Sequence, residues 1–355
     1  MMNNMLKRSI FSAATVVLLL SAVFGTGCEK WIEPEAKQYI VPEHTEAHKQ
    51  NIRDYLASPH RIMFGWYASP SAWSGKTTGT SKKGSLMGLP DSIDHVCLWL
   101  TMGNVTDAQV EDLKDFHALG HTTAMCWTPA NIGQNFTPEG EDPATFWGYA
   151  EGTEESYIAA AEKYAMAIVD TVRKYGLGGF ESDNESQGTL ISMSRPERFA
   201  AFARVLIREF EKDGNIFAID IPGSSGWLSY YQMLTDDVLE GIKYLAWQTY
   251  DFNTYSQIHN FLEGYSGASS VYGCKPHMYE TVLTKSILCT TFERGNNDKD
   301  KFLAQININY TSPSTGLQPL GYGAYHMEQD FDSDYGYDYP TVRRGISLLN
   351  PPIYE

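Results

Sequence analysis

The chain has 355 residues, and its 43 Asp and Glu against 27 Lys and Arg give a formal net charge of −16 at pH 7. So acidic a protein is not expected to bind nucleic acid through the phosphates, whereas a neutral glycan is a suitable ligand. The length suits one large α/β barrel or two smaller domains.

Residues 1–27 have the pattern of a bacterial lipoprotein signal peptide. Lys7 and Arg8 precede an apolar run at 10–24, which is too short and wrongly flanked for a stop-transfer helix. Small residues then lead to Cys28, as in a lipobox, so Cys28 is expected to be lipidated after cleavage. The alternative is ordinary secretion with an unmodified Cys28.

Residues 28–48 are expected to be a tether, because they contain Pro34, Pro42 and several charges. The acidic stretch directly after Cys28 resembles the surface-export signal of Bacteroidetes lipoproteins. The expected location is therefore the bacterial outer membrane, facing the cell surface, with the lipid as the contact to the membrane.

From residue 49 to 355, apolar runs rich in β-forming residues alternate with helical patterns. The runs expected to be strands are Arg61–Trp66, His95–Thr101, Thr122–Trp127, Gly179–Asp183, Ile216–Ile221, Tyr244–Tyr250, Ser270–Tyr279 and Gly321–His326. Their continuous apolar character suits strands that are buried on both faces. Eight such strands predict a single (β/α)8 TIM barrel.

The helical patterns fall between these strands. They are Thr106–Leu119, Glu154–Tyr175, Arg195–Lys212, Thr235–Gly241, Asn297–Ile308 and Asp338–Leu349. The stretch Ser69–Asp91 has no helical period and is rich in Gly, Ser, Thr and Lys, so it is expected to cross the mouth of the barrel.

In such barrels the functional side chains stand at the C-terminal ends of the strands. The strand ends here are rich in aromatic and amide groups, which stack on sugar rings and bond hydroxyl groups. The residues expected to bind substrate are Trp66, Tyr67, Trp127, Gln248, Asp251, Tyr279, Tyr325 and His326. For any single aromatic residue, packing in the core or at the rim is the alternative.

The most informative segment is 178–185, Gly-Gly-Phe-Glu-Ser-Asp-Asn-Glu. It places Glu181, Asp183 and Glu185 at alternate positions, so a strand would point all three carboxylates to one face. Crowded carboxylates shift one another's pKa values apart, which is a condition for acid/base chemistry. A loop with scattered surface acids is the alternative.

This segment resembles the strand-four signature of glycoside hydrolase family 18, the chitinases and endo-β-N-acetylglucosaminidases, which reads Asp-Gly-hydrophobic-Asp-x-Asp-x-Glu. The matching residues are Gly179, Phe180, Asp183 and Glu185. Gly178 and Glu181 replace the first and second Asp. The Glu at 181 either preserves the proton exchange with a shifted geometry or marks a protein that only binds glycan.

The resemblance implies a substrate-assisted reaction, in which the substrate's 2-acetamido carbonyl is the nucleophile. Glu185 would be the general acid and base, Asp183 would orient the acetamido group, and Glu181 would exchange a proton with Asp183. A Tyr-Asp pair typically ends strand six in this family. Tyr250 and Asp251 match it, and Tyr250 would donate its hydroxyl to the acetamido oxygen.

The last strand departs from the chitinases, which usually have a Trp there. This chain has Tyr322, Tyr325 and His326 instead. The resemblance therefore implies a surface endo-β-N-acetylglucosaminidase acting on N-glycans. The alternatives are a catalytically silent glycan-binding lipoprotein on the same barrel and a chitinase-like or peptidoglycan-directed hydrolase.

The sequence predicts neither a cofactor nor a metal site. Cys97, Cys126, Cys274 and Cys289 lie among apolar or β-forming neighbours and form no CxxC pair, so buried thiols are expected. An oxidising compartment would permit one disulfide, but the sequence does not pair the cysteines. The stretch 330–336 resembles a calcium loop only loosely, and a solvated acidic loop is expected there.

Overall fold

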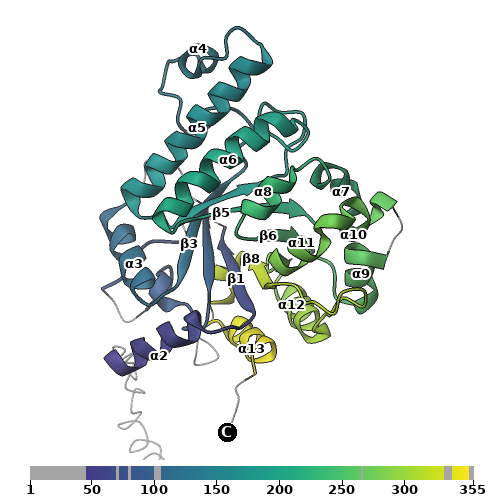
Figure 1. Ribbon diagram of the computed structural model, residues 1–355. Helices are drawn as coiled ribbons and strands as arrows, with labels where there is room; N and C mark the ends of the chain where they lie inside the picture. The colour runs from purple at the N-terminus through teal and green to yellow at the C-terminus, as the bar shows by residue number, and fades with distance from the viewer. Residues whose placement is uncertain are drawn as a thin grey trace, which may run out of the picture. The chain divides into compact units, whose positions relative to one another are not determined.

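Eight parallel strands close into a barrel in the computed structural model, which describes residues 45–68, 72–78, 81–99, 105–264, 267–331 and 338–351. The strands are β1 (Ile62–Tyr67), β2 (His95–Trp99), β3 (Thr122–Trp127), β4 (Gly179–Asp183), β5 (Ile216–Pro222), β6 (Leu245–Gln248), β7 (Ser286–Thr291) and β8 (Gly321–Tyr325). Each pairs with the next, and β8 pairs with β1 (Figure 1). The predicted (β/α)8 fold is confirmed. The predicted signal peptide, Cys28 and most of the predicted tether lie outside the described residues.

Helices surround the barrel. They are α2 (Glu46–Ala57), α3 (Asp107–Ala118), α4 (Pro143–Trp147), α5 (Glu154–Tyr175), α6 (Pro196–Asp213), α7 (Ser225–Tyr231), α8 (Asp236–Gly241), α9 (Tyr255–His259), α10 (Val271–Cys274), α11 (Tyr279–Lys285), α12 (Asn296–Ile308) and α13 (Pro340–Leu349). Shorter helical turns are η1 (Leu86–Gly88), η2 (Asn260–Gly264), η3 (Gly267–Ser269), η4 (Pro276–Met278) and η5 (Met327–Asp330). Among the described helices, none combines the length and hydropathy of a membrane span.

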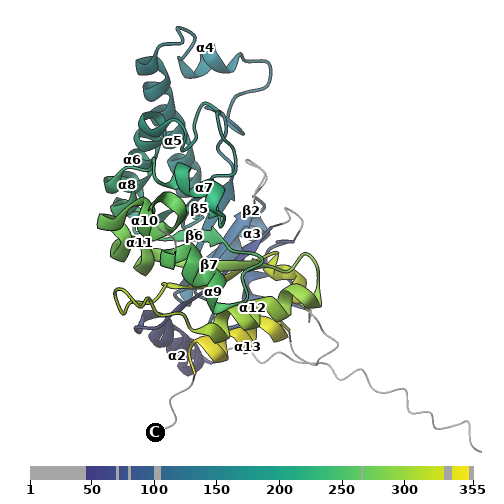
Figure 2. The ribbon, with the colours of Figure 1, turned by 90° about the vertical axis from the view of Figure 1, so that its right-hand side faces the viewer.

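Local signals fix the ends of the main helices. Thr106 and Gln109 form a reciprocal capping box at the start of α3, and Thr153 caps α5. Gly176 ends α5 in the left-handed conformation. Helices α5 and α6 lie side by side, and the connection between β3 and β4 extends away from the barrel with α4 at its far end (Figures 1 and 2).

Side chains alternate along each strand between the barrel interior and the layer under the helices. On β1, Phe64 and Trp66 face the interior, whereas Met63 and Tyr67 pack in the outer core. The interior cluster also contains Cys97, Cys126 and Cys289. The four cysteines predicted to be buried thiols are buried and free, so no disulfide links them.

The predicted seventh strand, Ser270–Tyr279, is wrong. This segment instead forms α10, η4 and the first residue of α11, because the Ser270 side chain caps a helical turn by accepting from the Gly273 N–H. Pro276 then opens the next turn, where its missing N–H needs no partner. The seventh strand is β7, which is buried along its whole length.

Two glycines allow β4 to start where it does. Gly178 has a φ of +75°, and a Cβ there would lie 2.6 Å from the Thr123 carbonyl oxygen. A Cβ at Gly179 would collide with the carbonyl oxygen of Ile216, its partner in the register of β4 and β5. The backbone therefore excludes a side chain at both positions, and the carboxylates that follow are fixed by close strand pairing.

Candidate active site

Three carboxylates of β4 and its end lie at the C-terminal mouth of the barrel interior. Glu181 and Asp183 are buried, with exposed fractions of 0% and 4%, and Glu185 is exposed just beyond the strand. The alternation that puts Glu181 and Asp183 on the inner face puts Phe180 and Ser182 on the other face.

A fourth carboxyl, which the sequence analysis missed, comes from the neighbouring strand. Asp220 of β5 is buried and is the register partner of Asp183. Carboxylate oxygens of Asp183, Glu185 and Asp220 all lie within 4.8 Å of one another. An isolated acid inside the otherwise apolar run Ile216–Ile221 was the available signal, because a buried carboxyl is rare without a partner or a function.

Neutral donors bind these four carboxyls. The Trp66 Nε1–H donates to Glu181 Oε1 at 2.5 Å, and the Thr128 hydroxyl donates to Asp183 Oδ2 at 2.8 Å. The other oxygens of these two carboxyls, Glu181 Oε2 and Asp183 Oδ1, have no hydrogen-bond partner among the described residues. These two oxygens can therefore carry the protons of the two carboxyls.

The side-chain amide of Gln248 links the exposed Glu185 to the buried Asp220. Gln248 Nε2, at the end of β6, donates to Glu185 Oε1 and to Asp220 Oδ1, both at 2.6 Å. Because the amide nitrogen has two hydrogens, both bonds form at once. Gln248 was predicted to bind substrate, and the structure places it inside the carboxyl cluster.

Burial and mutual repulsion favour the protonated forms of the buried acids. Burial, with the charges of Glu185 and Glu181, raises the pKa of Asp183 to about 8, against the lowering effect of the Thr128 hydroxyl. Burial raises the pKa of Glu181 as well, and burial with the charge of Asp183 raises that of Asp220 well above its usual range. Near neutral pH the group therefore carries fewer charges than separate carboxyls would, and its members hold fewer protons than there are carboxyls to bind them.

Tyr250 and Tyr325 line the same mouth. Their rings are stacked, with centroids 6.0 Å apart and planes inclined by 19°. Burial and the charge of Asp220 raise the pKa of Tyr250, and burial with the charge of Glu293 raises that of Tyr325 to about 12. Both hydroxyls therefore remain neutral donors beside the carboxylates.

A family model matches the part of the chain that carries the carboxylates of β4. The model of glycoside hydrolase family 18, BT1044-like, matches residues 28–209, which is more than half of the chain. The chain belongs to this family. Among the curated proteins that were compared, none matches.

Solved structures of family 18 proteins share the fold. A selenomethionine-labelled Glu-to-Gln variant of BT1044 is 23% identical, with a TM-score of 0.69 over 86% of this chain and 92% of that one. The endo-β-N-acetylglucosaminidase of Cordyceps militaris is 19% identical, with a TM-score of 0.60 over 87% and 98%. A group IV chitinase of Ostrinia furnacalis is 12% identical, with a TM-score of 0.51 over 81% and 99%.

Three predicted sugar-binding aromatic residues lie elsewhere than expected for this family 18 barrel. Trp66 points into the interior but is only 1% exposed, beneath the carboxyls. Tyr67 and Trp127 point outward, because they alternate with the inner positions, and they bond Tyr339 and Tyr164 in the outer core. None of the three presents a ring face to solvent.

The position predicted for Tyr279, at the end of a barrel strand, is wrong. Tyr279 begins helix α11, is buried, and packs against the ring of Tyr272. The true end of the seventh strand leads to Glu293 instead. Thr291 Oγ1 donates to Glu293 Oε2 at 3.3 Å there.

Asp251 and His326 lie at the rim with partners of their own. Asp251 pairs with Arg294 and Lys301, which ties the end of β6 to the start of α12. The His326 Nδ1 lies 2.6 Å from Glu328 Oε1, and its ring meets the Tyr325 ring edge-on at 4.4 Å. His326 therefore supports Tyr325 in the structure.

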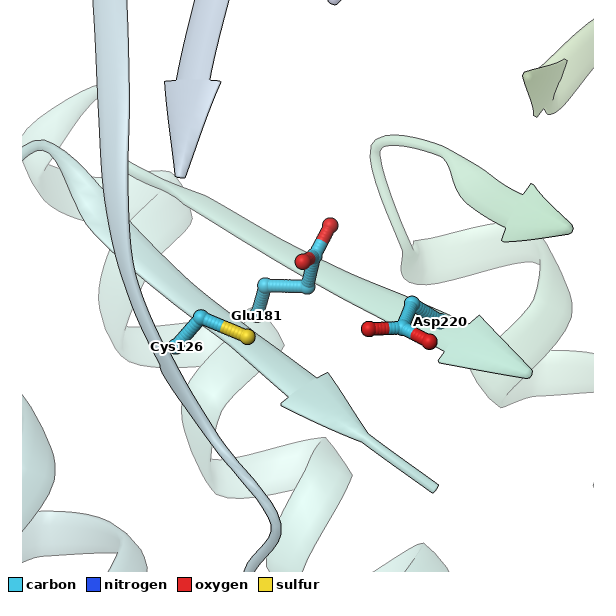
Figure 3. Close-up of side chains that lie close together, drawn as sticks. All are labelled: Cys126, Glu181 and Asp220. Atoms are coloured by element: carbon cyan, nitrogen blue, oxygen red, sulfur yellow. The ribbon is translucent and has the colours of Figure 1, made fainter. Parts of the chain in front are cut away.

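Two groups among the described residues have ligand atoms close enough to hold a cation. They are Asp183, Glu185 and Asp220, and Cys126, Glu181 and Asp220. Figure 3 shows the second group projecting from β3, β4 and β5 into one space. Burial raises the pKa of the Cys126 thiol well above its usual range, which disfavours the thiolate that a metal requires.

Proposed function

We propose that this chain is a retaining endo-β-N-acetylglucosaminidase in which the substrate's own acetamido group is the nucleophile. The observation that carries the proposal is the juxtaposition of Asp183 and Glu185, whose oxygens lie within 4.8 Å of each other, at the barrel mouth beside Tyr250. Substrate-assisted hydrolysis needs one acid for the leaving oxygen and a second for the acetamido N–H.

Glu185 is exposed, so it reaches the glycosidic oxygen and donates its proton as the C–O bond breaks. The acetamido carbonyl oxygen attacks the anomeric carbon, and the ionised Asp183 accepts the N–H and stabilises the positive charge of the oxazolinium. Tyr250 donates its hydroxyl to the attacking oxygen. Water then opens the oxazolinium, passes its proton to Glu185, and restores the sugar with retention.

Two features support an N-glycan substrate. The β8 end provides Tyr325, stacked on Tyr250, and no Trp. A variant of the Cordyceps militaris enzyme, 18% identical with a TM-score of 0.58, was solved with fucosyl-N-acetylglucosamine-Asn. A glycan that ends in two GlcNAc residues on Asn is therefore the substrate to try first.

The test is incubation of high-mannose and complex glycoproteins with the wild type, Glu185→Gln and Asp183→Asn, followed by mass spectrometry. We expect release that leaves one GlcNAc on the protein, and a fall of about 10²–10⁴-fold in the Glu185→Gln variant, because the amide cannot deliver a proton. Glu211→Gln, an exposed position on α6, is the matched control. Glycan binding without release in the wild type would support the silent glycan-binding alternative, and equal rates in all variants would remove Glu185 from the reaction.

We also propose that Cys28 carries lipid and anchors the protein to the outer membrane. The support is the sequence alone, in which small residues after an apolar run precede Cys28. Cys28→Ala should shift the protein from the membrane to the soluble fraction or leave the signal peptide attached. Fractionation with mass spectrometry of the N-terminus measures this, and membrane partition equal to that of the wild type would contradict the anchor.

A further inference from the structure

The family motif places its first acid at position 178, where this chain cannot carry a side chain. Gly178 has a left-handed φ of +75°, and a Cβ there would lie 2.6 Å from the Thr123 carbonyl. A further acid, which the motif does not contain, lies on the next strand. Asp220 is 1% exposed and stands level with Asp183 in the register of β4 and β5.

Asp220 is the member common to both groups of close-lying ligand atoms found in the described residues. Its ligand atom lies within 4.8 Å of those of Asp183 and Glu185. It is also within 4.8 Å of those of Glu181 and Cys126, which Figure 3 shows. Two buried oxygens of these acids, Glu181 Oε2 and Asp183 Oδ1, have no hydrogen-bond partner among the described residues. At such distances four carboxylates cannot all be ionised, so the group must share protons.

The second contact of Asp220 leads to the general acid. Gln248 Nε2 donates to Asp220 Oδ1 and Glu185 Oε1 at 2.6 Å each, so the position of the amide depends on both acceptors. Without Asp220, one amide hydrogen would lose its acceptor, and Gln248 would be free to turn away from Glu185.

We propose that Asp220 is a positioning residue of the reaction centre, which fixes Gln248 against Glu185 and shares the protons of the buried carboxyl group with Glu181 and Asp183. The role of Asp220 in catalysis rests on the proposed function, whereas the sharing of protons does not. When Asp183 ionises to meet the acetamido N–H, its proton moves to Asp220 or Glu181, and the number of protons in the group is unchanged.

The titratable groups that face Asp220 come from five strands or strand ends. They are Cys97 of β2, Cys126 of β3, Glu181, Asp183 and Glu185 of β4, Tyr250 after β6 and Cys289 of β7. None of these groups is a cation. Removing the charge of Asp220 therefore lowers the pKa values of the remaining acids.

A ligand-free double-mutant cycle tests the sharing of protons. Asp183→Asn, Asp220→Asn and the double variant are unfolded thermally at pH 5 and pH 8. If the two carboxyls share a proton, each single variant relieves the same repulsion at pH 8, so the rise in Tm of the double variant is smaller than the sum of the two single rises. At pH 5 the three variants should unfold close to the wild type, which shows that they fold. Additive shifts at pH 8 would overturn the proposal.

Kinetics test whether the shared protons of Asp220 affect the reaction. On a substrate that the wild type cleaves, Asp220→Asn should keep KM within about twofold, because the amide oxygen still accepts from Gln248. It should lower kcat by about tenfold and move the alkaline limb of the pH profile down by about one unit. Asp112→Asn is the control, since Asp112 is equally buried but bonds Trp73, Ser85 and Leu86 instead. An alkaline limb that does not move in Asp220→Asn would refute the role of Asp220 in the reaction. A wild type that cleaves no GlcNAc substrate would instead refute the proposed function, and the double-mutant cycle would still decide whether the carboxyls share protons.

Discussion

Trp66 is one of the side chains that affect the pKa of the buried Glu181. Its indole N–H is the donor to Glu181 Oε1, while Oε2 has no partner among the described residues. Burial raises the pKa of Glu181, and because a donor to a carboxylate stabilises the ionised form, Tyr244 and then Trp66 oppose that rise. Trp66, which was expected to stack on a sugar, therefore affects the pKa of Glu181 instead.

Trp66→Phe is expected to destabilise the protein by about 1–3 kcal/mol, because a buried acceptor loses its donor. The loss should grow from pH 6 to pH 9, since the ionised form of Glu181 is the form that Trp66 stabilises. Urea unfolding at the two pH values measures it. Trp247→Phe is the control, because its indole is equally buried but donates to the neutral Ser286 hydroxyl at 3.0 Å. Equal losses at both pH values in both variants would contradict this role of Trp66.

At the scale of the element, the close approach of β4 and β5 holds the carboxyl cluster together. Gly179 faces Ile216 in the register, and a Cβ there meets the Ile216 backbone nitrogen at 3.0 Å as well as its carbonyl oxygen. A methyl group would push the two strands apart. Asp183 and Asp220, four positions further along each strand, would then separate.

Gly179→Ala is therefore expected to cost more than 3 kcal/mol of stability, roughly the range of severe core changes, and to abolish activity. Gly176→Ala is the matched control: this glycine has a φ of +67° but no atom within 4 Å of an added Cβ. It should cost about 1 kcal/mol from the left-handed backbone alone. Chemical denaturation compares the two, and a loss no larger for Gly179→Ala than for Gly176→Ala would show that the strands adapt.

The sequence was sufficient to predict the helices and strands whose signals are local. Capped helices and seven of the strands follow from caps and apolar runs, and alternation puts Glu181 and Asp183 on one face. The seventh strand was predicted at Ser270–Tyr279, one segment too early. The residues at 281–284 and 287–292 are both apolar or β-branched, so their pattern alone does not tell helix α11 from strand β7, and tertiary packing decides. Asp220 was missed because its contact with Asp183 depends on the register of two strands, which neither strand encodes alone.

At the scale of the whole molecule, buried and surface acids oppose each other in their effect on stability. Burial raises the pKa of Asp183 to about 8 and those of Glu181 and Asp220 in the same direction. On the surface, hydrogen bonds from Lys212 and Arg208 lower the pKa of Glu209 to about 2, and a bond from Arg204 lowers that of Asp237 to about 2. The first group binds protons more tightly in the folded state, and the second group binds them less tightly.

These opposite shifts predict an optimum of stability at mildly acidic pH. An acid with a raised folded pKa loses stability as pH rises from its unfolded value near 4 to its folded value, about 8 for Asp183. An acid with a lowered pKa loses stability as pH falls from about 4 to about 2. The Tm should therefore be highest near pH 4–5 and fall between pH 5 and pH 8. Calorimetry across this range measures it, and Asp183→Asn should flatten the alkaline side while leaving the acid side unchanged. A wild-type Tm that rises steadily up to pH 8 would mean that the buried acids are ionised without cost, contrary to their burial among neutral donors.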